Sequence, residues 1–157
     1  MATSKDFVLP KRKLSKTKTL HYSDVLESDE YLILDVEFGF RIHFELYHKF
    51  IDENIIPLTK GELGYTSLTP LSNHDVLKFI WLINDQEYLF ELDNGSDGID
   101  LRRFYDKLIE IQKNSGTQRN LVLFHDINFG QEYGLAYIDK KTKKKLFSLF
   151  DIGVLDW

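Results

Sequence analysis

The clearest pattern of apolar and polar positions lies between residues 76 and 93. Val76–Ile83 is a run of mostly apolar residues, rich in β-branched and aromatic side chains, which predicts a strand covered on both faces. Asn84–Gln86 predicts a turn. Glu87–Asp93 then alternates between apolar and acidic residues, as a strand with one buried face does. The sequence therefore predicts an antiparallel hairpin.

A helix is predicted directly after this hairpin. Asn94–Gly98 is a cluster of turn-forming residues, and beyond it apolar residues recur every three or four positions over Ile99–Gln112. Ser96 or Asp97 is expected to cap the first turn. Gly116 stands where such a helix would end.

A longer alternation precedes the hairpin. Eight successive even-numbered positions from Leu32 to Leu46 are apolar, with mostly polar residues between them. This period of two predicts either one long strand bent at Gly39 or two strands joined by a three-residue loop about Gly39. For Tyr47–Ile56 the pattern allows strand or helix, and both stay open.

The C-terminal part of the chain predicts further strands. Leu121–Phe124 is a short apolar strand, and Tyr133–Asp139 and Leu146–Phe150 flank Lys140–Lys145 as a hairpin with a lysine-rich turn. The expected fold is α+β. It is a curved, mainly antiparallel sheet or partial barrel of about seven or eight strands, packed by one main helix.

Length and composition set the domain organisation. We expect a flexible basic tail over residues 1–20 and a single α+β domain over residues 21–157. No apolar stretch is long enough for a transmembrane helix, and the N-terminus lacks an apolar signal segment. The expected location is intracellular, cytoplasmic or nuclear. The absence of cysteine excludes disulfides, thiolate zinc sites and cysteine nucleophiles, and no cofactor is predicted.

The net charge of −5 is unevenly distributed. Residues 1–20 contain six basic residues and one acid, residues 21–139 have a net charge of −13, and residues 140–157 contain five lysines and two aspartates. An acidic body is a poor general platform for nucleic acid. It suits a basic protein partner, although an acidic surface also simply keeps a protein soluble.

Two basic segments are the candidate sites for targeting or anion contact. The tail cluster can serve an import receptor, nucleic acid or anionic lipid, or can be a solvated tail. The lysine turn can meet phosphate groups of lipid or nucleic acid, or can only aid solubility. The candidate residues are Lys11, Arg12, Lys13, Lys16, Lys18, Lys140, Lys141, Lys143, Lys144 and Lys145.

Catalytic motifs are largely missing. His43, Glu45 and His48 would not share one face of a strand, so they do not predict a metal site. His125 and Asp126 have the chemistry of a base and its orienting carboxylate, but no nucleophile accompanies them. We therefore expect a protein that is not an enzyme, and an enzyme centred on His125 is the least favoured hypothesis.

Part of the chain resembles the C-terminal half of a pleckstrin-homology-like domain. The residues concerned are Phe79–Trp81, Tyr88–Leu92 and the helix over Ile99–Gln112. The resemblance implies a curved antiparallel barrel closed at one end by a helix, serving as a scaffold for lipid headgroups, peptides or proteins. Three features depart from that family. The helix has Phe104 and Tyr105 where many members have tryptophan, the expected first hairpin has only Arg41 as a basic residue, and residues 113–157 follow the helix.

Two function hypotheses follow. The favoured one is a non-enzymatic protein–protein interaction domain, an adapter or scaffold with an acidic body, whose partner is another protein. The alternative is a small acidic antagonist, such as a microbial immunity protein that blocks a basic toxin or enzyme. Contact with nucleic acid or anionic lipid is expected only through the basic tail or the lysine turn.

Overall fold

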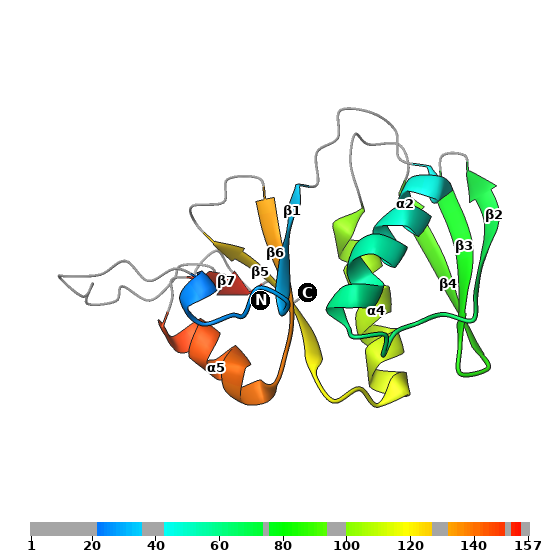
Figure 1. Cartoon of the computed structure of the whole chain (residues 1–157). Helices are drawn as coiled ribbons and strands as arrows, with labels where there is room; N and C mark the ends of the chain where they lie inside the picture. The colour runs from blue at the N-terminus through cyan, green and yellow to red at the C-terminus, as the bar shows by residue number, and fades with distance from the viewer. Residues whose placement is uncertain are drawn as a thin grey trace, which may run out of the picture. The chain divides into compact units, whose positions relative to one another are not determined.

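The computed structural model divides the chain into two compact units. Unit 1 comprises residues 1–34 and 119–157, and unit 2 comprises residues 35–118 (Figure 1). The structure describes residues 22–35, 43–73, 76–93, 100–126, 132–149 and 152–154. The α+β class is confirmed. The tail over residues 1–20 lies outside the described residues, and the single-domain boundary at 21–157 stays a prediction.

Unit 2 contains an antiparallel sheet of three strands in the order β2-β3-β4. Its strands are β2 (Ser67–Asn73), β3 (Val76–Ile83) and β4 (Gln86–Asp93). The predicted hairpin is confirmed, because Ile83 pairs with Gln86 across a two-residue turn. Asn84 and Asp85 in that turn have φ values of 51° and 61°, which the two-residue turn requires and which Asn and Asp tolerate.

One face of this sheet forms the core of unit 2. Alternate residues of β3 and β4 are buried, among them Phe79, Trp81 and Phe90, which are fully buried. The Phe90 ring stacks on Phe79, with centroids 4.7 Å apart, and on Trp81, with centroids 5.5 Å apart. The prediction that β3 is covered on both faces is wrong. Val76 is 40% exposed and its neighbours on that face are only half-buried, because the aromatic contacts of the helices in unit 2 fall on the other face.

The predicted main helix is α4 (Leu101–Ser115), and it covers the buried face of β4. Phe104 lies 5.7 Å from Phe90, centroid to centroid. The helix begins at Asp100, whose carboxylate accepts a bond from the Arg103 amide, and not at Ser96 or Asp97, which lie outside the described residues. It ends at Gly116 as predicted, with φ 64°.

A second helical segment lies on the same side of the sheet (Figure 1). It runs through α2 (Phe44–Phe50), the π-helix η2 (Ile51–Ile55) and α3 (Ile56–Leu58). The predicted strand pattern is therefore wrong at its end, and Tyr47–Ile56 is helical. The physical reason is a competing helical period, since the buried residues of this segment recur every three or four positions. These residues are Phe44, Tyr47, Ile51, Ile55 and Leu58.

The beginning of that alternation belongs to unit 1. There β1 (Tyr31–Asp35) forms a four-stranded sheet with β5 (Asn120–Asp126), β6 (Glu132–Ile138) and β7 (Ile152–Val154), in the order β1-β6-β5-β7. β5 pairs antiparallel with β6 and with β7. This confirms the strands predicted at Leu121–Phe124 and Tyr133–Asp139. The break at Gly39 lies outside the described residues.

The core of unit 1 joins this sheet to a short 3-10 helix, η1 (Tyr22–Asp24), and to the C-terminal helix. Its buried cluster consists of Leu26, Val122, Phe124, Ala136, Ile138 and Leu146. Tyr22 and Tyr31 both pack against this cluster. Their two rings contact each other edge to face, with centroids 5.0 Å apart. Arg119 forms an ion pair with Glu30 at 3.4 Å within the same unit.

The predicted lysine-rich turn is wrong. Lys140–Leu149 form a helix, α5, which also replaces the strand predicted at Leu146–Phe150. Asp139 caps it, since its carboxylate accepts a bond from the Thr142 amide at 2.7 Å and its carbonyl accepts one from the Lys143 amide. Lysine is a good helix former, and Leu146 anchors the helix in the core.

The predicted single curved sheet is also not what the described residues form. Their seven strands are divided between two small sheets, and neither is closed. Among the described residues, β2, β3 and β4 pair only with one another, whereas β1 pairs with the C-terminal strand β6. The pleckstrin-homology-like resemblance stays a prediction.

Candidate functional site

The face of the β2–β3–β4 sheet opposite the core of unit 2 presents apolar side chains to solvent; we call it the outer sheet face. Its centre is formed by Val76, Ile80 and Leu82 of β3 and Leu89 of β4. Val76 and Leu89 are 40% and 38% exposed, and Ile80 stands directly opposite Leu89 in the strand register. Sequence alone placed these residues in strands but did not reveal their exposure.

Acidic residues of β4 lie beside this apolar centre. Glu87, Glu91 and Asp93 alternate along β4 on the outer sheet face, and all three are exposed. Lys78 stands opposite Glu91 and forms an ion pair with it at 3.5 Å. An exposed pair of this kind contributes little to stability, so the carboxylates remain part of the surface chemistry.

The first strand of the sheet carries two features that disfavour strand addition. β2 lies at an edge of the sheet, with Pro70 in it and an irregularity in its register between Pro70 and Ser72. Leu71 is the extra residue at that irregularity and is 54% exposed. Proline and bulges are common devices that prevent further strands from pairing at an edge. The outer sheet face is thus better suited to side-chain contacts than to strand addition at β2.

A polar cluster lies at the junction of α2 and η2. The Tyr65 hydroxyl donates to Asp52 Oδ1 at 2.5 Å and lies 2.9 Å from His48 Nε2. His48 Nε2 is also 3.3 Å from Asp52 Oδ2. Because the phenol has one proton and gives it to Asp52, His48 must donate from Nε2 to the phenol oxygen. A π-helix often marks a functional position, and here it supplies Asp52.

The chemistry of this cluster is that of a fixed hydrogen-bond network. Desolvation, together with the hydrogen bond and the charge of Asp52, raises the pKa of Tyr65 to about 12, so the phenol stays neutral at ordinary pH. The Tyr65 ring packs edge to face with Trp81, with centroids 5.8 Å apart. Trp81 is fully buried, and its indole N–H has no hydrogen-bond partner within the described part of the chain.

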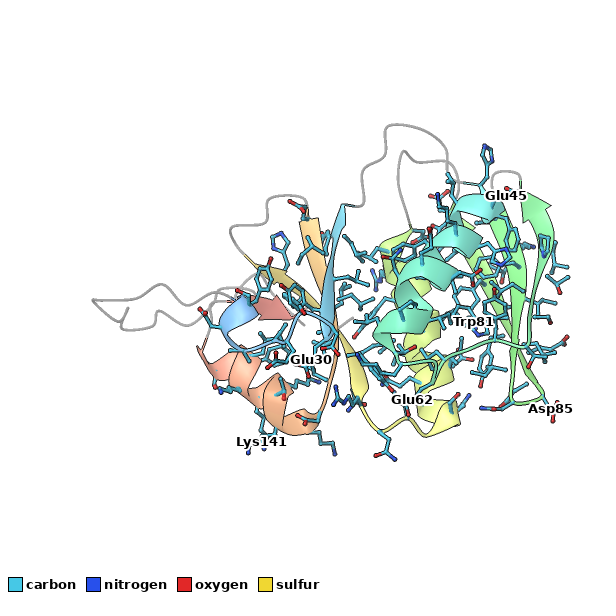
Figure 2. All side chains as sticks on the ribbon, in the orientation of Figure 1. Glu30, Glu45, Glu62, Trp81, Asp85 and Lys141 are labelled. Atoms are coloured by element: carbon cyan, nitrogen blue, oxygen red, sulfur yellow. The ribbon has the colours of Figure 1, made fainter. Side chains whose placement is uncertain are left out.

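The structure places half of the predicted anion-contact residues on α5. Lys140, Lys141, Lys144 and Lys145 are exposed there, and Figure 2 shows Lys141 pointing away from the strands of unit 1. Lys143 is half-buried, with its ammonium group 5.7 Å from the centre of the Phe147 ring. The predicted tail residues, Lys11, Arg12, Lys13, Lys16 and Lys18, lie outside the described residues.

The cap of α5 adds one fixed negative charge near these lysines. Hydrogen bonds from the backbone amide and side chain of Thr142 hold the pKa of Asp139 below its ordinary value, and Lys141 acts in the same direction. The cap therefore stays ionised at neutral pH. It occupies the amide end of α5 that an external anion would otherwise contact.

Other candidates for chemistry are not assembled into a site. His125 is half-buried and its ring lies 5.1 Å from that of Tyr133. Within the described ranges, no group of three or more His, Asp or Glu side chains is placed to hold a metal ion. No helix in the described part of the chain is long and apolar enough to cross a membrane.

Comparisons with protein-family models, with curated proteins and with solved structures find no match to this chain.

Proposed function

We propose that this protein is a non-enzymatic interaction domain that binds a basic protein partner through the outer sheet face. The observation that supports this proposal is the exposed apolar centre of that face, with carboxylates on the adjacent strand. Specific protein interfaces commonly combine an apolar centre with a polar, solvated rim. Val76, Ile80, Leu82 and Leu89 provide such a centre, and Glu87, Glu91 and Asp93 provide such a rim.

Burial of this apolar centre would supply affinity. Fully burying a leucine or isoleucine side chain contributes about 1.5–3 kcal/mol relative to leaving it exposed. Leu89 and Val76 are already partly covered, so each would contribute less than that. Ile80 and Leu89 stand opposite one another and would be covered together by one apolar side chain of a partner.

The carboxylates would supply orientation and partner choice. Unit 2 contains eight basic and fifteen acidic residues, a net charge of −7. Complementary charge steers association and rejects partners of like charge more than it adds affinity. Binding of a basic partner to this face should therefore weaken as salt is raised, mainly through slower association.

A second candidate is an antagonist of a basic protein, such as a microbial immunity protein that blocks a basic toxin or enzyme. The same acidic rim favours this candidate, because a basic active-site surface would be attracted to it. The two candidates differ in their effect on the partner. An antagonist abolishes the partner's own activity on binding, whereas an adapter leaves that activity intact.

Affinity capture from the native host with matched surface variants tests the proposal. Ile80→Ser/Leu89→Ser removes the apolar centre, and Glu87→Lys/Glu91→Lys reverses the rim. Glu45→Lys/Glu53→Lys is the control, because it reverses two exposed carboxylates elsewhere in unit 2. We expect one partner to be retained by the wild type and the control and lost from both outer-face variants.

Purified components then confirm that the contact is direct. The captured partner should show binding in calorimetry to the wild type and the control. Its lysines should form zero-length carbodiimide cross-links to Glu87 or Glu91. Equal retention of the partner by the wild type and both outer-face variants, with far-ultraviolet circular dichroism unchanged, would refute the proposed surface.

A further inference from the structure

We infer that α5 of unit 1 binds the phosphodiester backbone of nucleic acid through four lysines, Lys140, Lys141, Lys144 and Lys145. We call these four residues the lysine face. The inference concerns a different unit from the outer sheet face and does not depend on the proposed function. For the lysine-rich segment the sequence alone allowed either phosphate contact or a role in solubility, and the inference favours phosphate contact.

The helix gathers these lysines on one side. Lys140 and Lys144 are separated by four residues, as are Lys141 and Lys145, so each pair lies one turn apart on the same helical face. At about 100° per residue the four positions fall within one arc, on the side opposite Leu146. Leu146 is fully buried in the core of unit 1, so the lysine face is directed to solvent.

This arrangement is unfavourable for the helix itself. Like charges four residues apart repel one another, and cations at the first turns of a helix oppose its dipole. The ion pairs within the part of the chain that the structure describes do not include these four lysines, and of the four it is Lys141 that the Asp139 carboxylate attracts. A polyanionic ligand would relieve this repulsion.

Recognition would come from the side chains and not from the helix end. Asp139 already accepts a hydrogen bond from the Thr142 amide at the start of α5. Lys143 is half-buried and has its ammonium group 5.7 Å from the centre of the Phe147 ring, so it is not counted in the lysine face. The ligand would thus be bound by flexible ammonium groups, which act as point charges for phosphates and do not discriminate between base sequences.

The burial of α5 favours nucleic acid over a lipid surface. A membrane-bound amphipathic helix inserts its apolar face between lipids. In α5 the apolar residue Leu146 is buried in the core of unit 1 and is therefore not available for insertion. Duplex DNA has one negative charge per about 1.7 Å of its axis, so a short stretch of backbone meets all four lysines at once. A narrow contact of this kind is also compatible with the net charge of −13 of residues 21–139.

The salt dependence of binding follows from the number of lysines. Four phosphate contacts on duplex DNA give a slope of about −3.6 in a plot of log K against log salt concentration. Between 50 and 200 mM KCl this slope corresponds to a loss of affinity of about 150-fold. The slope of log K against log salt concentration therefore reports the number of basic side chains that contact phosphates.

Fluorescence anisotropy of the full chain with a labelled 20-base-pair duplex tests the inference. Lys141→Gln/Lys145→Gln removes one half of the lysine face, and Lys49→Gln/Lys113→Gln removes two exposed lysines from unit 2 as a matched control. We expect the first variant to bind at least about tenfold more weakly at 50 mM KCl and its salt slope to fall in magnitude by about 1.8. The control should match the wild type.

Three outcomes would overturn the inference. The first is equal duplex binding by the wild type and Lys141→Gln/Lys145→Gln. The second is an equal loss in both variants, which would show that net charge alone governs binding. The third is binding to vesicles containing phosphatidylserine without binding to the duplex or to a single-stranded RNA of the same length. The melting temperature of each variant should be no lower than that of the wild type, which shows that any loss of binding is not a loss of folding.

Discussion

The two units of this protein differ in both surface charge and core chemistry. Unit 2 has a net charge of −7, whereas unit 1 contains twelve basic and ten acidic residues. Unit 2 is built on stacked aromatic rings, whereas the cluster in unit 1 is mostly aliphatic around Phe124. The overall charge of −5 conceals this separation. This separation of charge is the reason that we propose a different kind of partner for each unit.

The largest expected effect is loss of the aromatic stack of unit 2. Phe90→Ala removes a fully buried ring that contacts Phe79, Trp81 and Phe104, and should lower the free energy of unfolding by about 3–5 kcal/mol. Urea denaturation in a Trp157→Phe background measures this, because Trp81 is then the sole tryptophan and reports on unit 2. A cost below about 1 kcal/mol would show that the stack does not hold this unit together.

The next effect tests the close packing in the core of unit 1. Gly134 stands opposite Phe124 in the sheet, and a Cβ atom at position 134 would overlap the Phe124 ring. Gly134→Ala should destabilise the protein by about 1–3 kcal/mol through overpacking. Gly134→Ala/Phe124→Leu should recover part of the loss in thermal denaturation. Full stability of the single variant would contradict the described contact.

A smaller effect concerns the polar cluster of unit 2 at high pH. The pKa of Tyr65 is raised to about 12, so the stabilisation from its neutral form is present below pH 10 and is lost as the pH rises through about 12. The tyrosinate absorbance difference between the wild type and Tyr65→Phe should therefore have its midpoint near 12. Asp52→Asn should lower that midpoint, because it removes the negative charge beside the phenol. An unchanged midpoint would show that Asp52 does not contribute to the raised pKa beside desolvation.

The smallest effect concerns the cap of α5 in unit 1 at low pH. The pKa of Asp139 is lowered, so its stabilisation is present above the ordinary aspartate pKa and is lost as the pH falls through the lower value of the folded protein. The melting temperature of Asp139→Asn should vary less between pH 7 and pH 3 than that of the wild type, since asparagine caps without titrating. Identical pH profiles of the two proteins would contradict this role.

Local signals were sufficient to predict the hairpin and the main helix of unit 2. The alternation in β4, the Asn84–Asp85 turn and the helical period of α4 are all contained in short stretches of sequence. The lysine-rich segment was mispredicted because its charge between two apolar stretches suggested a solvated turn. The stronger signals there were the helix propensity of lysine and the Asp139 cap.

The candidate surfaces were harder to predict from the sequence. The residues of the outer sheet face were assigned to strands, but their exposure depends on which side of the sheet the helices cover. The cluster of His48, Asp52 and Tyr65 joins residues up to 17 positions apart in the sequence. Asp52 lies in a π-helix, which no local sequence pattern predicts. The basic residues of α5 were recognised as candidates, but only the helix shows that four of them share one side.

The separation of charge between the two units is tested most directly by one comparison of duplex binding. Lys141→Gln/Lys145→Gln removes two positive charges from unit 1, and Glu87→Gln/Glu91→Gln removes two negative charges from unit 2. In anisotropy titrations at 50 mM KCl we predict that the first variant loses affinity at least about tenfold and that the second changes by less than about twofold. Equal and opposite shifts in the two variants would show that only net charge matters, and would contradict the assignment of separate binding surfaces.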